Sequence, residues 1–325
     1  MQLIINHCTG PAFNLALEEY ILTKKSGGFI ILWRNEASVI VGRNQNAIEE
    51  IDMGFTKNHD VKVVRRLSGG GAVFHDLGNI NYSVITEFKG TGFGDFGKFA
   101  APVCEFLNGL GVDAYLEGRN DLLIGGAKFS GNAQAVKNGR ILHHGTILFD
   151  ADISWLAAAL KPGAAKIESK GVKSVRSRVT NVTSHLPGPM GVDEFFEQLS
   201  GFFLDKACGL YRLSDSDVSE AQLLVAEKYG TWGWNFGTSP AYSYQHSERF
   251  PFGTVDLRLS VEGGFIKAVH IFGDFFGKLE VEGLEGKLLG LAHNGHDIAE
   301  ALNNVDISSY IQGITNGQFF SLFKK

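Results

Sequence analysis

The chain has 325 residues, of which 44% are hydrophobic, and it carries a formal net charge of −5. This length suits one large domain with a small one, or two domains, each with its own core. The negative charge argues against a general nucleic-acid binder, and no apolar run reaches the roughly 18 residues that a membrane helix needs. The first residues lack the features of a signal or transit peptide, so we expect a cytoplasmic protein.

The predicted elements alternate between groups of strands and single helices. The first helix is expected over residues 14–25, because Leu17 and Ile21 are four residues apart, and Asn14 is expected to cap it. The β-rich runs that follow are FIILWR, SVIVGR, VKVVRRLS, INYSVIT, DAYLEG, LLIGGAKFSG and RILHHGTILFD. The helical patterns are FAAPVCEFLNGL, ISWLAAALK and VDEFFEQLSGFFLDKAC. Strands in groups, with helices set between them, predict an α+β fold.

A change in composition near residues 230–253 suggests a domain boundary, because the segment is aromatic, contains Gly and Pro, and has no clear period. We expect a linker there. In the next segment, apolar and polar residues alternate on both sides of Gly263-Gly264, which predicts two strands joined by a tight hairpin turn. A helix is expected over HDIAEALNNV, so a small α/β unit should begin near residue 246.

The stretch GFGDFG, Gly92 to Gly97, fits the dinucleotide-binding spacing, and Glu117 follows it at about the expected distance. However, three residues separate it from the preceding strand. That strand also alternates between polar and apolar residues, unlike a buried parallel strand, which is apolar throughout. The same stretch has the G-x-x-x-x-G-K spacing of a P-loop, but Phe99 occupies the position at which a P-loop has the Ser or Thr that binds magnesium. We therefore interpret it as a surface loop.

The stretch RRLSGGGAVFHD suggests an anion site. Gly69, Gly70 and Gly71 can adopt positive φ and let a ligand approach the backbone, whose successive N–H groups can face an anion. Arg65 and Arg66 add planar guanidinium groups that bind phosphate or carboxylate through two bonds.

Lys128 lies in an apolar, glycine-rich strand region, where a lysine favours an anionic partner, although a solvated lysine is the more ordinary interpretation. The pair Asn120-Asp121 is consistent with a turn, a ligand-recognising pair or a metal ligand, and the spacing alone does not separate these. His143 and His144 should point to opposite faces of a strand. The segment KGVKSVRSRVTN is either a solvated loop or a mobile basic loop that closes on an anion.

The three cysteines, Cys8, Cys104 and Cys208, are far apart and form no metal or disulfide pattern. We expect them to be small buried side chains. None lies in a motif, so we expect no thioester-forming nucleophile.

Taken together, these pieces resemble the lipoate–protein ligase A family of the biotin/lipoate protein ligase superfamily. The matching blocks are FNLALEE, ILWRNEASVIVGRNQN, RRLSGGGAVFHDLGN, GRNDL, KFSGNA, HHGTILFDAD, KGVKSVRSRVTN and WGWNFG…PAYS, in this order over most of the chain. The resemblance implies a large α+β catalytic domain with mixed sheets over residues 1–236, a linker over 237–245 and a small C-terminal accessory domain over 246–325.

The resemblance also implies two half-reactions. Lipoate and ATP, with Mg²⁺, give lipoyl-AMP, and the lipoyl group then passes to a lysine of an acceptor domain, such as an E2 subunit of a 2-oxoacid dehydrogenase or the glycine cleavage H protein. The ATP contacts it implies are Arg66, Gly71, Ala72, Val73, Phe74 and Lys128. Lys128 would be the catalytic residue that touches both lipoate and nucleotide.

The lipoate contacts implied by the resemblance are Lys128, Arg65, Leu17, Trp33, His75 and His144, with Val73 near the same slot. The adenylate contacts are Asn120, Asp121 and Arg176, and Asp121 is the candidate metal ligand. Leu67 departs from the family pattern, in which Ser is common. We expect a monomer that binds neither nucleic acid nor membrane. A transferase of the same fold without ATP, a biotin ligase and a noncatalytic lipoate- or nucleotide-binding regulator are the alternatives.

Overall fold

The structure is a computed structural model that describes residues 1–160, 179–236, 244–293 and 295–323. It divides into two compact units. The larger consists of Met1–Val41, Ala47–Leu67 and Ala72–Asn235, and the smaller of Gly42–Asn46, Ser68–Gly71 and Phe236–Lys325. The inclusion of two short N-terminal segments in the smaller unit was not predicted.

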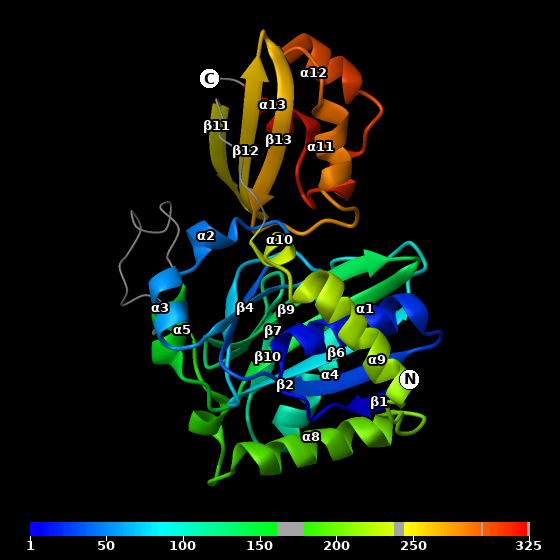
Figure 1. The fold of residues 1–325 in the computed structure, drawn as a ribbon. Coiled ribbons are helices and arrows are strands. Elements are labelled where there is room, and N and C mark those ends of the chain that lie inside the picture. The colour runs from blue at the N-terminus through cyan, green and yellow to red at the C-terminus, as the bar shows by residue number, and fades with distance from the viewer. Residues whose placement is uncertain (161–178, 237–243, 294, 324–325) are drawn as a thin grey trace. The chain divides into compact units, whose positions relative to one another are not determined.

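A seven-stranded sheet forms the centre of the larger unit, in the order β1-β2-β6-β10-β9-β8-β7 (Figure 1). Its strands are β1 (Gln2–Ile5), β2 (Phe29–Arg34), β6 (Asn79–Glu87), β7 (Ala114–Glu117), β8 (Asp121–Ile124), β9 (Ala127–Lys137) and β10 (Arg140–Leu148). Only β1 and β2 pair in parallel; the other neighbours are antiparallel. This pattern confirms the α+β prediction and differs from a doubly wound nucleotide-binding sheet.

Helices cover both faces of this sheet. Alternate residues of β2 enter two different cores, with Ile30 and Leu32 in one and Ile31 and Trp33 in the other. The first core is closed by α4 (Phe96–Gly109) and α8 (Val192–Lys206). The second is closed by α1 (Pro11–Lys24), α9 (Asp215–Leu224) and the π-helix η2 (Val225–Tyr229).

The first helix begins earlier than predicted, at Pro11, with Gly10 as its N-cap. The prediction that Asn14 caps the helix is therefore wrong, because Asn14 lies inside α1 and is buried. Proline suits the first turn, where its missing N–H would have no intrahelical partner. Since α1 is buried on nearly all sides, its apolar residues mark no single face.

A second, three-stranded sheet in the larger unit has the order β4-β3-β5. It consists of β3 (Ser38–Val41), β4 (Lys62–Arg65) and β5 (Val73–His75) and carries both ends of the arginine–glycine stretch. The remaining short helices of this unit are α2 (Ala47–Glu50), α3 (Met53–Asn58), α5 (Ile153–Ala159), η1 (Val182–His185) and α10 (Trp232–Asn235).

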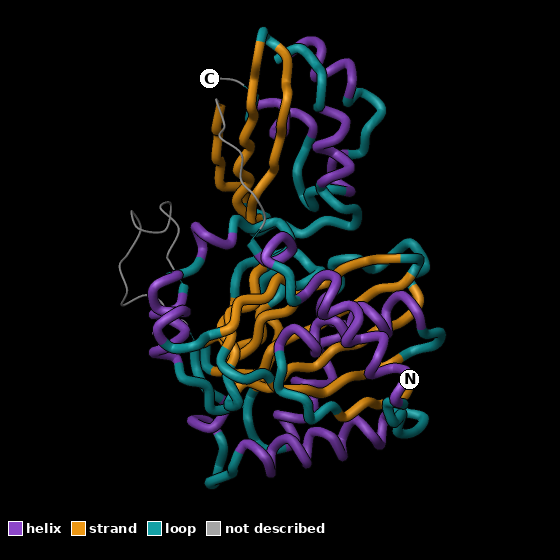
Figure 2. Tube along the Cα trace, in the orientation of Figure 1, coloured by secondary structure: helices purple, strands orange, loops and turns teal. Residues whose placement is uncertain are grey.

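The smaller unit contains an antiparallel sheet, β11-β12-β13, whose strands are β11 (Tyr244–Phe250), β12 (Gly253–Glu262) and β13 (Phe265–Gly273) (Figure 2). Gly263 and Gly264 have φ of 58° and 84°, which confirms the predicted hairpin turn. The helices of this unit are α11 (Glu282–Leu288), α12 (Gly295–Ala301), η3 (Ile307–Ser309) and α13 (Asn316–Ser321). β11 occupies part of the segment interpreted as a linker. Regular structure therefore begins at Tyr244, within the segment 230–253 in which we expected a linker.

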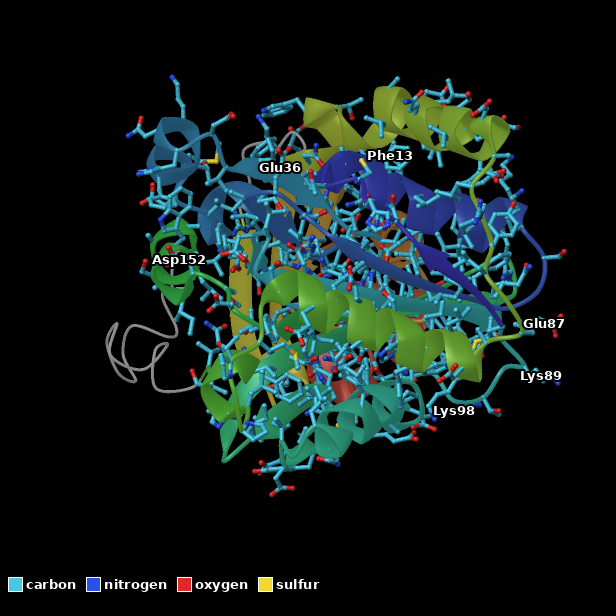
Figure 3. The ribbon with its side chains drawn as sticks, turned by 90° about the horizontal axis from the view of Figure 1, so that it is seen from below. Phe13, Glu36, Glu87, Lys89, Lys98 and Asp152 are labelled. Carbon is cyan, nitrogen blue, oxygen red and sulfur yellow. The ribbon has the colours of Figure 1, made fainter. Side chains whose placement is uncertain are left out.

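The first four residues of GFGDFG form a turn, as expected for a surface loop, whereas Phe96 and Gly97 begin α4 and the side chain of Phe96 is buried. Gly92 and Gly94 both have φ of 88°, and the carboxylate of Asp95 accepts a hydrogen bond from the Lys98 amide as the N-cap of α4. Glu87, Lys89 and Lys98, which flank this segment, lie at the periphery in Figure 3. Among the described residues, no helix is long and apolar enough to span a membrane.

Candidate active site

A buried polar cluster lies where α1 crosses β2, β6 and β10. Trp33 Nε1 donates to Ser83 Oγ at 3.0 Å, and Ser83 Oγ donates to Glu18 Oε1 at 2.5 Å. His144 Nδ1 lies 3.0 Å from the same carboxylate oxygen. The strand register explains the grouping, because Ser83 on β6 faces His144 on β10 and Ile31 on β2. The Glu18 carboxylate, which is only 2% exposed, thus has two buried side-chain partners, Ser83 and His144.

His75 and Arg66 extend this cluster from the three-stranded sheet. The rings of His75 and Trp33 meet edge to face with their centroids 6.2 Å apart. Burial, together with the positive charge of Arg66 and the proximity of His144, lowers the pKa of His75 to about 3, so its imidazole is neutral at physiological pH. Burial also lowers the pKa of Arg66 to about 10, against the opposing charge of Glu18. Arg66 NH1 donates to the Ile40 carbonyl at 3.1 Å.

The structure therefore brings together most residues of the predicted lipoate slot. Leu17, Trp33 and the partly buried Val73 pack in one apolar cluster on the same face of the seven-stranded sheet. His143 and His144 point to opposite faces, as predicted. His143 stacks on Phe99 of α4, and His144 reaches Glu18 of α1.

Arg65 has a different environment from the one we expected. Its Nε and NH2 atoms donate to the carbonyl oxygens of Trp234 and Asn235 at 2.9 and 3.0 Å. Its main-chain N–H donates to Asn235 Oδ1, and its carbonyl accepts from Trp234 Nε1, both at 2.9 Å. Arg65 thus ties β4 to α10.

The glycine run is less open than the sequence suggested. Of its three glycines, only Gly70 has a positive φ, 91°. A Cβ at Gly69 would lie 2.2 Å from the Phe275 carbonyl oxygen, and the Gly70 N–H donates to that oxygen at 3.2 Å. A Cβ at Gly71 would meet no atom within 4 Å. Gly69 is therefore required for packing within the smaller unit, and space beside the backbone remains at Gly71.

The segment after the glycines leads into β5. Ala72 and Val73 are partly exposed, whereas the side chain of Phe74 is 2% exposed and its ring lies 6.2 Å from that of Trp155. A ligand at this segment would therefore meet the backbone of Phe74 rather than its ring.

Lys128 pairs with Asp121 at the β8–β9 hairpin. The Nζ–Oδ1 distance is 2.8 Å, and the two side chains are 35% and 40% exposed, so a ligand can reach both. Asn120 is held by Asn132, whose main-chain N–H donates to the Asn120 carbonyl at 2.9 Å, and whose own carbonyl accepts from Asn120 Nδ2 at 2.6 Å. Asn120 ends the turn between β7 and β8, and Asp121 begins β8, in agreement with the first of the three interpretations, a turn. Arg176 and most of the basic loop lie outside the described residues.

The sequence analysis missed Glu18, Ser83 and Asn35. The available signal was the pair Glu18-Glu19 inside an otherwise apolar helix, since buried acids require partners. Glu19 is indeed paired, with Lys137 Nζ at 2.9 Å and Lys228 Nζ at 2.6 Å. Burial raises its pKa, but the hydrogen bonds and charges of Lys228 and Lys137 outweigh this effect and lower the pKa overall.

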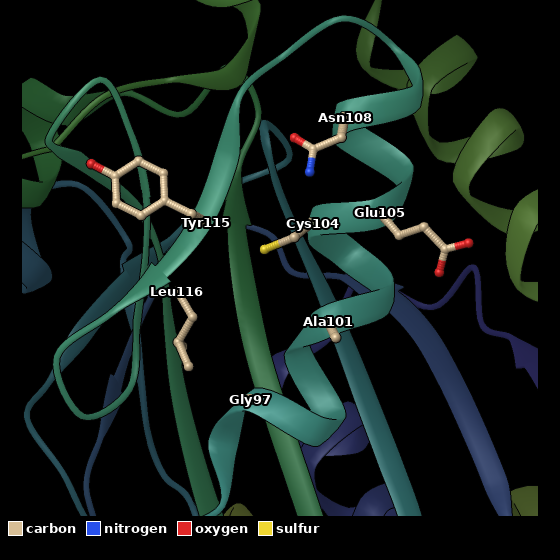
Figure 4. A pocket seen from close by; sticks show the side chains of 7 residues that line it. All are labelled: Gly97, Ala101, Cys104, Glu105, Asn108, Tyr115 and Leu116. Atoms are coloured by element: carbon tan, nitrogen blue, oxygen red, sulfur yellow. The ribbon is translucent and has the colours of Figure 1, made fainter.

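The cysteines and the groove beside α4 lie apart from this cluster. Cys8 and Cys208 are exposed and Cys104 is partly buried, so the prediction of buried thiols was wrong for the first two. Cys104 lines a groove of about 470 Å³ between α4 and β7, and Figure 4 shows its side chain pointing between these two elements. Burial raises the pKa of its thiol to about 11, which disfavours a thiolate. The residues that line the groove are Gly97, Ala101, Cys104, Glu105, Asn108, Tyr115 and Leu116.

Both parts of the chain match models of known families. Residues 10–204 match the lipoyl protein ligase A/B catalytic domain, and residues 239–323 match the bacterial lipoate protein ligase C-terminus. The chain belongs to the lipoate–protein ligase family. It shares 41% identity over 320 residues with lipoate–protein ligase 1 of Staphylococcus aureus, covering 98% of both chains. With lipoate–protein ligase LplJ of Bacillus subtilis it shares 43% over 318 residues, covering 96% of both.

Solved structures agree with this family assignment. A lipoate–protein ligase A bound with ATP is 30% identical, with a TM-score of 0.63 over 73% of this chain and 98% of that one. The archaeal bi-partite lipoate protein ligase of Thermoplasma acidophilum, solved as part of a lipoylation system with its E2 lipoyl domain, is 31% identical, with a TM-score of 0.65 over 75% of this chain and 98% of that one.

Proposed function

We propose that this member of the lipoate–protein ligase family activates lipoate with ATP and transfers the lipoyl group to a lysine of an acceptor domain. The lipoate carboxylate attacks the α-phosphorus of ATP, and pyrophosphate leaves. The lysine amine of the acceptor then attacks the carbonyl of lipoyl-AMP, and AMP leaves. The observation that carries this proposal is the match over both the catalytic and the C-terminal parts, and the buried polar side chains beside Arg66 support it.

Positive charge placed in advance would let two anionic reactants meet. Lys128 would act as the catalytic residue, with its ammonium between the lipoate carboxylate and the α-phosphate, and the ligand would displace it from Asp121. Arg66 and the backbone of Gly71, Ala72, Val73 and Phe74 would hold the phosphates. Each charge-assisted hydrogen bond would contribute roughly 1.5–3 kcal/mol.

Magnesium fits the residues that are present, with the substrate phosphates as its main ligands. Among the described residues, no three His, Cys, Asp or Glu side chains are grouped to hold a metal by themselves. Mg²⁺ commonly binds through one or two carboxylates plus phosphates, and Asp121 would supply one carboxylate. Bound there, the ion would neutralise phosphate charge.

The apolar slot would hold the acyl chain. Leu17, Trp33, His75 and His144 would line it, and burial of about four methylenes would contribute roughly 3 kcal/mol at ~0.8 kcal/mol each. Arg65 would support the slot by fixing the end of β4. Asn120, Asp121 and Arg176 would contact the adenylate.

The acceptors we propose are E2 lipoyl domains and the glycine cleavage H protein, acted on by a cytoplasmic monomer. The E2 lipoyl domain named with the Thermoplasma ligase supports the first of these. We further propose that residues 1–236 carry catalysis, that residues 237–245 link the two parts, and that residues 246–325 form an accessory domain.

Lipoate-dependent exchange of labelled pyrophosphate into ATP tests the first half-reaction, and the mass added to a purified acceptor domain tests the second. We expect both signals to require lipoate. Transfer from a preformed thioester without ATP would instead identify a transferase. Binding of lipoate or nucleotide without either signal would identify a regulator, and exchange that depends on biotin would identify a biotin ligase.

A further inference from the structure

A chain of buried side-chain amides runs from Asn6, directly after β1, through Asn14 and Asn35 to His75. Asn6 Nδ2 donates to Asn14 Oδ1 at 2.7 Å, and Asn14 Nδ2 donates to Asn35 Oδ1 at 2.9 Å. Asn35 Nδ2 in turn lies 3.1 Å from His75 Nδ1. All four side chains are less than 10% exposed, and Asn35 is fully buried. Water therefore does not compete for these groups.

Backbone groups fix the orientations of Asn6 and Asn14, and Asn14 in turn fixes that of Asn35. Asn6 Oδ1 accepts from the Cys8 amide at 3.1 Å, so its NH₂ group must face Asn14. Asn14 Nδ2 lies 2.8 Å from the Cys8 carbonyl and 3.0 Å from the Arg34 carbonyl, and carbonyls only accept. The two N–H groups of Asn14 are thus shared among these carbonyls and Asn35, which must present its oxygen, because a second NH₂ would meet a nitrogen that accepts no hydrogen bond.

The consequence is a single tautomer of His75. With its oxygen turned toward Asn14, Asn35 can present only N–H to Nδ1, so Nδ1 must be an acceptor. A neutral imidazole that accepts at Nδ1 carries its proton at Nε2. Nε2 is buried and has no hydrogen-bond partner in the described part of the chain. An N–H donor is thus held ready without an acceptor.

We propose that Asn35 is a positioning residue that locks His75 in the Nε2–H tautomer, and that this N–H donates a hydrogen bond to an acceptor atom of the bound acyl substrate. The second half rests on the proposed lipoate-binding function. The neighbouring Trp33 ring and the neutral state of the imidazole suit a weakly polar acceptor in an apolar slot. Lipoate offers two kinds of acceptor, the dithiolane sulfurs and the carboxylate oxygens.

His143 provides an internal comparison. Its Nδ1 lies 3.3 Å from Gln134 Nε2, and its Nε2 lies 3.2 Å from Asn132 Oδ1, which also accepts from Tyr82. The same reasoning gives His143 the Nε2–H tautomer, but its proton already has a partner. A substrate should therefore change the environment of the His75 proton and leave that of His143 unchanged.

NMR of the full chain labelled with ¹⁵N-histidine tests the tautomer directly. The resonances of His75 are identified by their loss in His75→Gln. We expect Nδ1 of His75 to be unprotonated and Nε2 to be protonated without ligand, and the Nε2–H signal to shift on addition of lipoate. A protonated Nδ1 in the wild type would overturn the tautomer assignment. In Asn35→Asp, which presents only acceptors to Nδ1, we expect Nδ1 to gain a proton; an unchanged Nδ1 signal in that folded variant would refute the role of Asn35.

Calorimetric titration of folded His75→Leu and His75→Gln with lipoate tests the donor. Loss of one hydrogen bond should weaken lipoate binding by roughly 3- to 10-fold in His75→Leu. His75→Gln retains an acceptor for Asn35 and an N–H donor, so it should bind close to the wild type. Wild-type affinity in His75→Leu, or equal weakening in both variants, would show that the slot needs the ring for packing and not for its donor.

Octanoate distinguishes the two acceptors, because it has the carboxylate but no sulfur. Weakening of lipoate alone in His75→Leu would identify a sulfur, and equal weakening of both acids would identify the carboxylate. A wild-type chain that bound neither acid would refute the proposed function and the substrate bond together, whereas the tautomer is decided by the ligand-free spectrum.

Discussion

The cores of the two units differ in their polarity. In the larger unit, the cluster of Glu18, Ser83 and His144 lies against buried apolar residues, and the amide chain leads into it. In the described residues of the smaller unit, nineteen buried hydrophobic residues form one cluster, and the buried polar residues are Gln45, Asn46, Ser68, Arg258 and Glu285.

This difference suggests that the polar core of the larger unit serves function, whereas the core of the smaller unit serves stability. Burying polar groups costs free energy unless each is hydrogen-bonded, so a core that carries so many of them is built for another purpose. In the larger unit these groups surround the proposed substrate slot. The core of the smaller unit is mostly apolar, so hydrophobic burial is the main source of its stability.

The largest effect should come from Lys128→Ala, which removes the proposed catalytic charge from the larger unit. We expect adenylate formation to fall by about 10²–10³-fold, the usual effect of losing one preorganised donor, with an unchanged melting temperature. Pyrophosphate exchange measures the loss. Lys98→Ala, an exposed lysine on α4, is the matched control. Near-normal exchange in Lys128→Ala would remove the catalytic assignment.

The glycine run offers a test inside the smaller unit. Gly69→Val should destabilise this unit by about 2–3 kcal/mol through overpacking, because even a Cβ would lie 2.2 Å from the Phe275 carbonyl oxygen. Gly71→Val, with no atom within 4 Å of a Cβ, should unfold as the wild type does but bind ATP more weakly. Denaturant melts and ATP titrations separate the two. Equal loss of lipoate and ATP affinity in Gly71→Val would point to general damage instead.

Glu19→Gln tests the cost of the polar network in the larger unit. Lys137, Lys228 and the Tyr229 hydroxyl would lose their anionic partner, and we expect a loss of roughly 2 kcal/mol at pH 7. Because the pKa of Glu19 is lowered on folding, its contribution is present above its unfolded pKa and is lost as the pH falls through the folded value. The variant should therefore lose less stability on acidification than the wild type. Glu220→Gln, on the exposed surface of α9, should melt as the wild type does.

Glu285 predicts the opposite dependence for the smaller unit. Burial raises the pKa of this carboxyl to about 7 despite the bond that it accepts from the Ile271 amide. The folded unit therefore holds a proton that the unfolded chain releases, and stability should decline between about pH 4.5 and 7 as the pH rises. Glu285→Gln keeps the amide bond and should stabilise the unit by roughly 1–2 kcal/mol at pH 8. A pH-independent difference from the wild type would contradict this mechanism, and Glu262→Gln is the exposed control.

The smallest effect should come from the cysteines. A variant with Cys8, Cys104 and Cys208 changed to Ser, Ser and Ala should retain ATP-dependent transfer, with a stability loss below about 1 kcal/mol. Mass spectrometry of the acceptor domain measures transfer. A folded variant that still made lipoyl-AMP but no longer transferred it would indicate a covalent thioester step.

Short-range sequence patterns were sufficient to predict several features of the structure. The alternation of apolar and polar residues along β12 and β13 and the Gly263-Gly264 pair predicted their hairpin. Asp95, the fourth residue of GFGDFG, proved to be a helix cap rather than part of a dinucleotide fingerprint. Such features depend on residues within one or two turns of each other, so the local sequence is enough to specify them. The motif blocks likewise indicated the family that both parts of the chain match.

Tertiary structure alone decided which of the candidate residues meet. Glu18 and His144 are 126 residues apart, and they touch only because α1 lies across β10. Asn14 lost its predicted capping role because the fold buries it beside Asn6 and Asn35, and Gly69 is constrained by a carbonyl more than 200 residues away. Sequence patterns report local conformation and burial. The partners of a buried polar group depend on strand order and packing, which no local pattern contains.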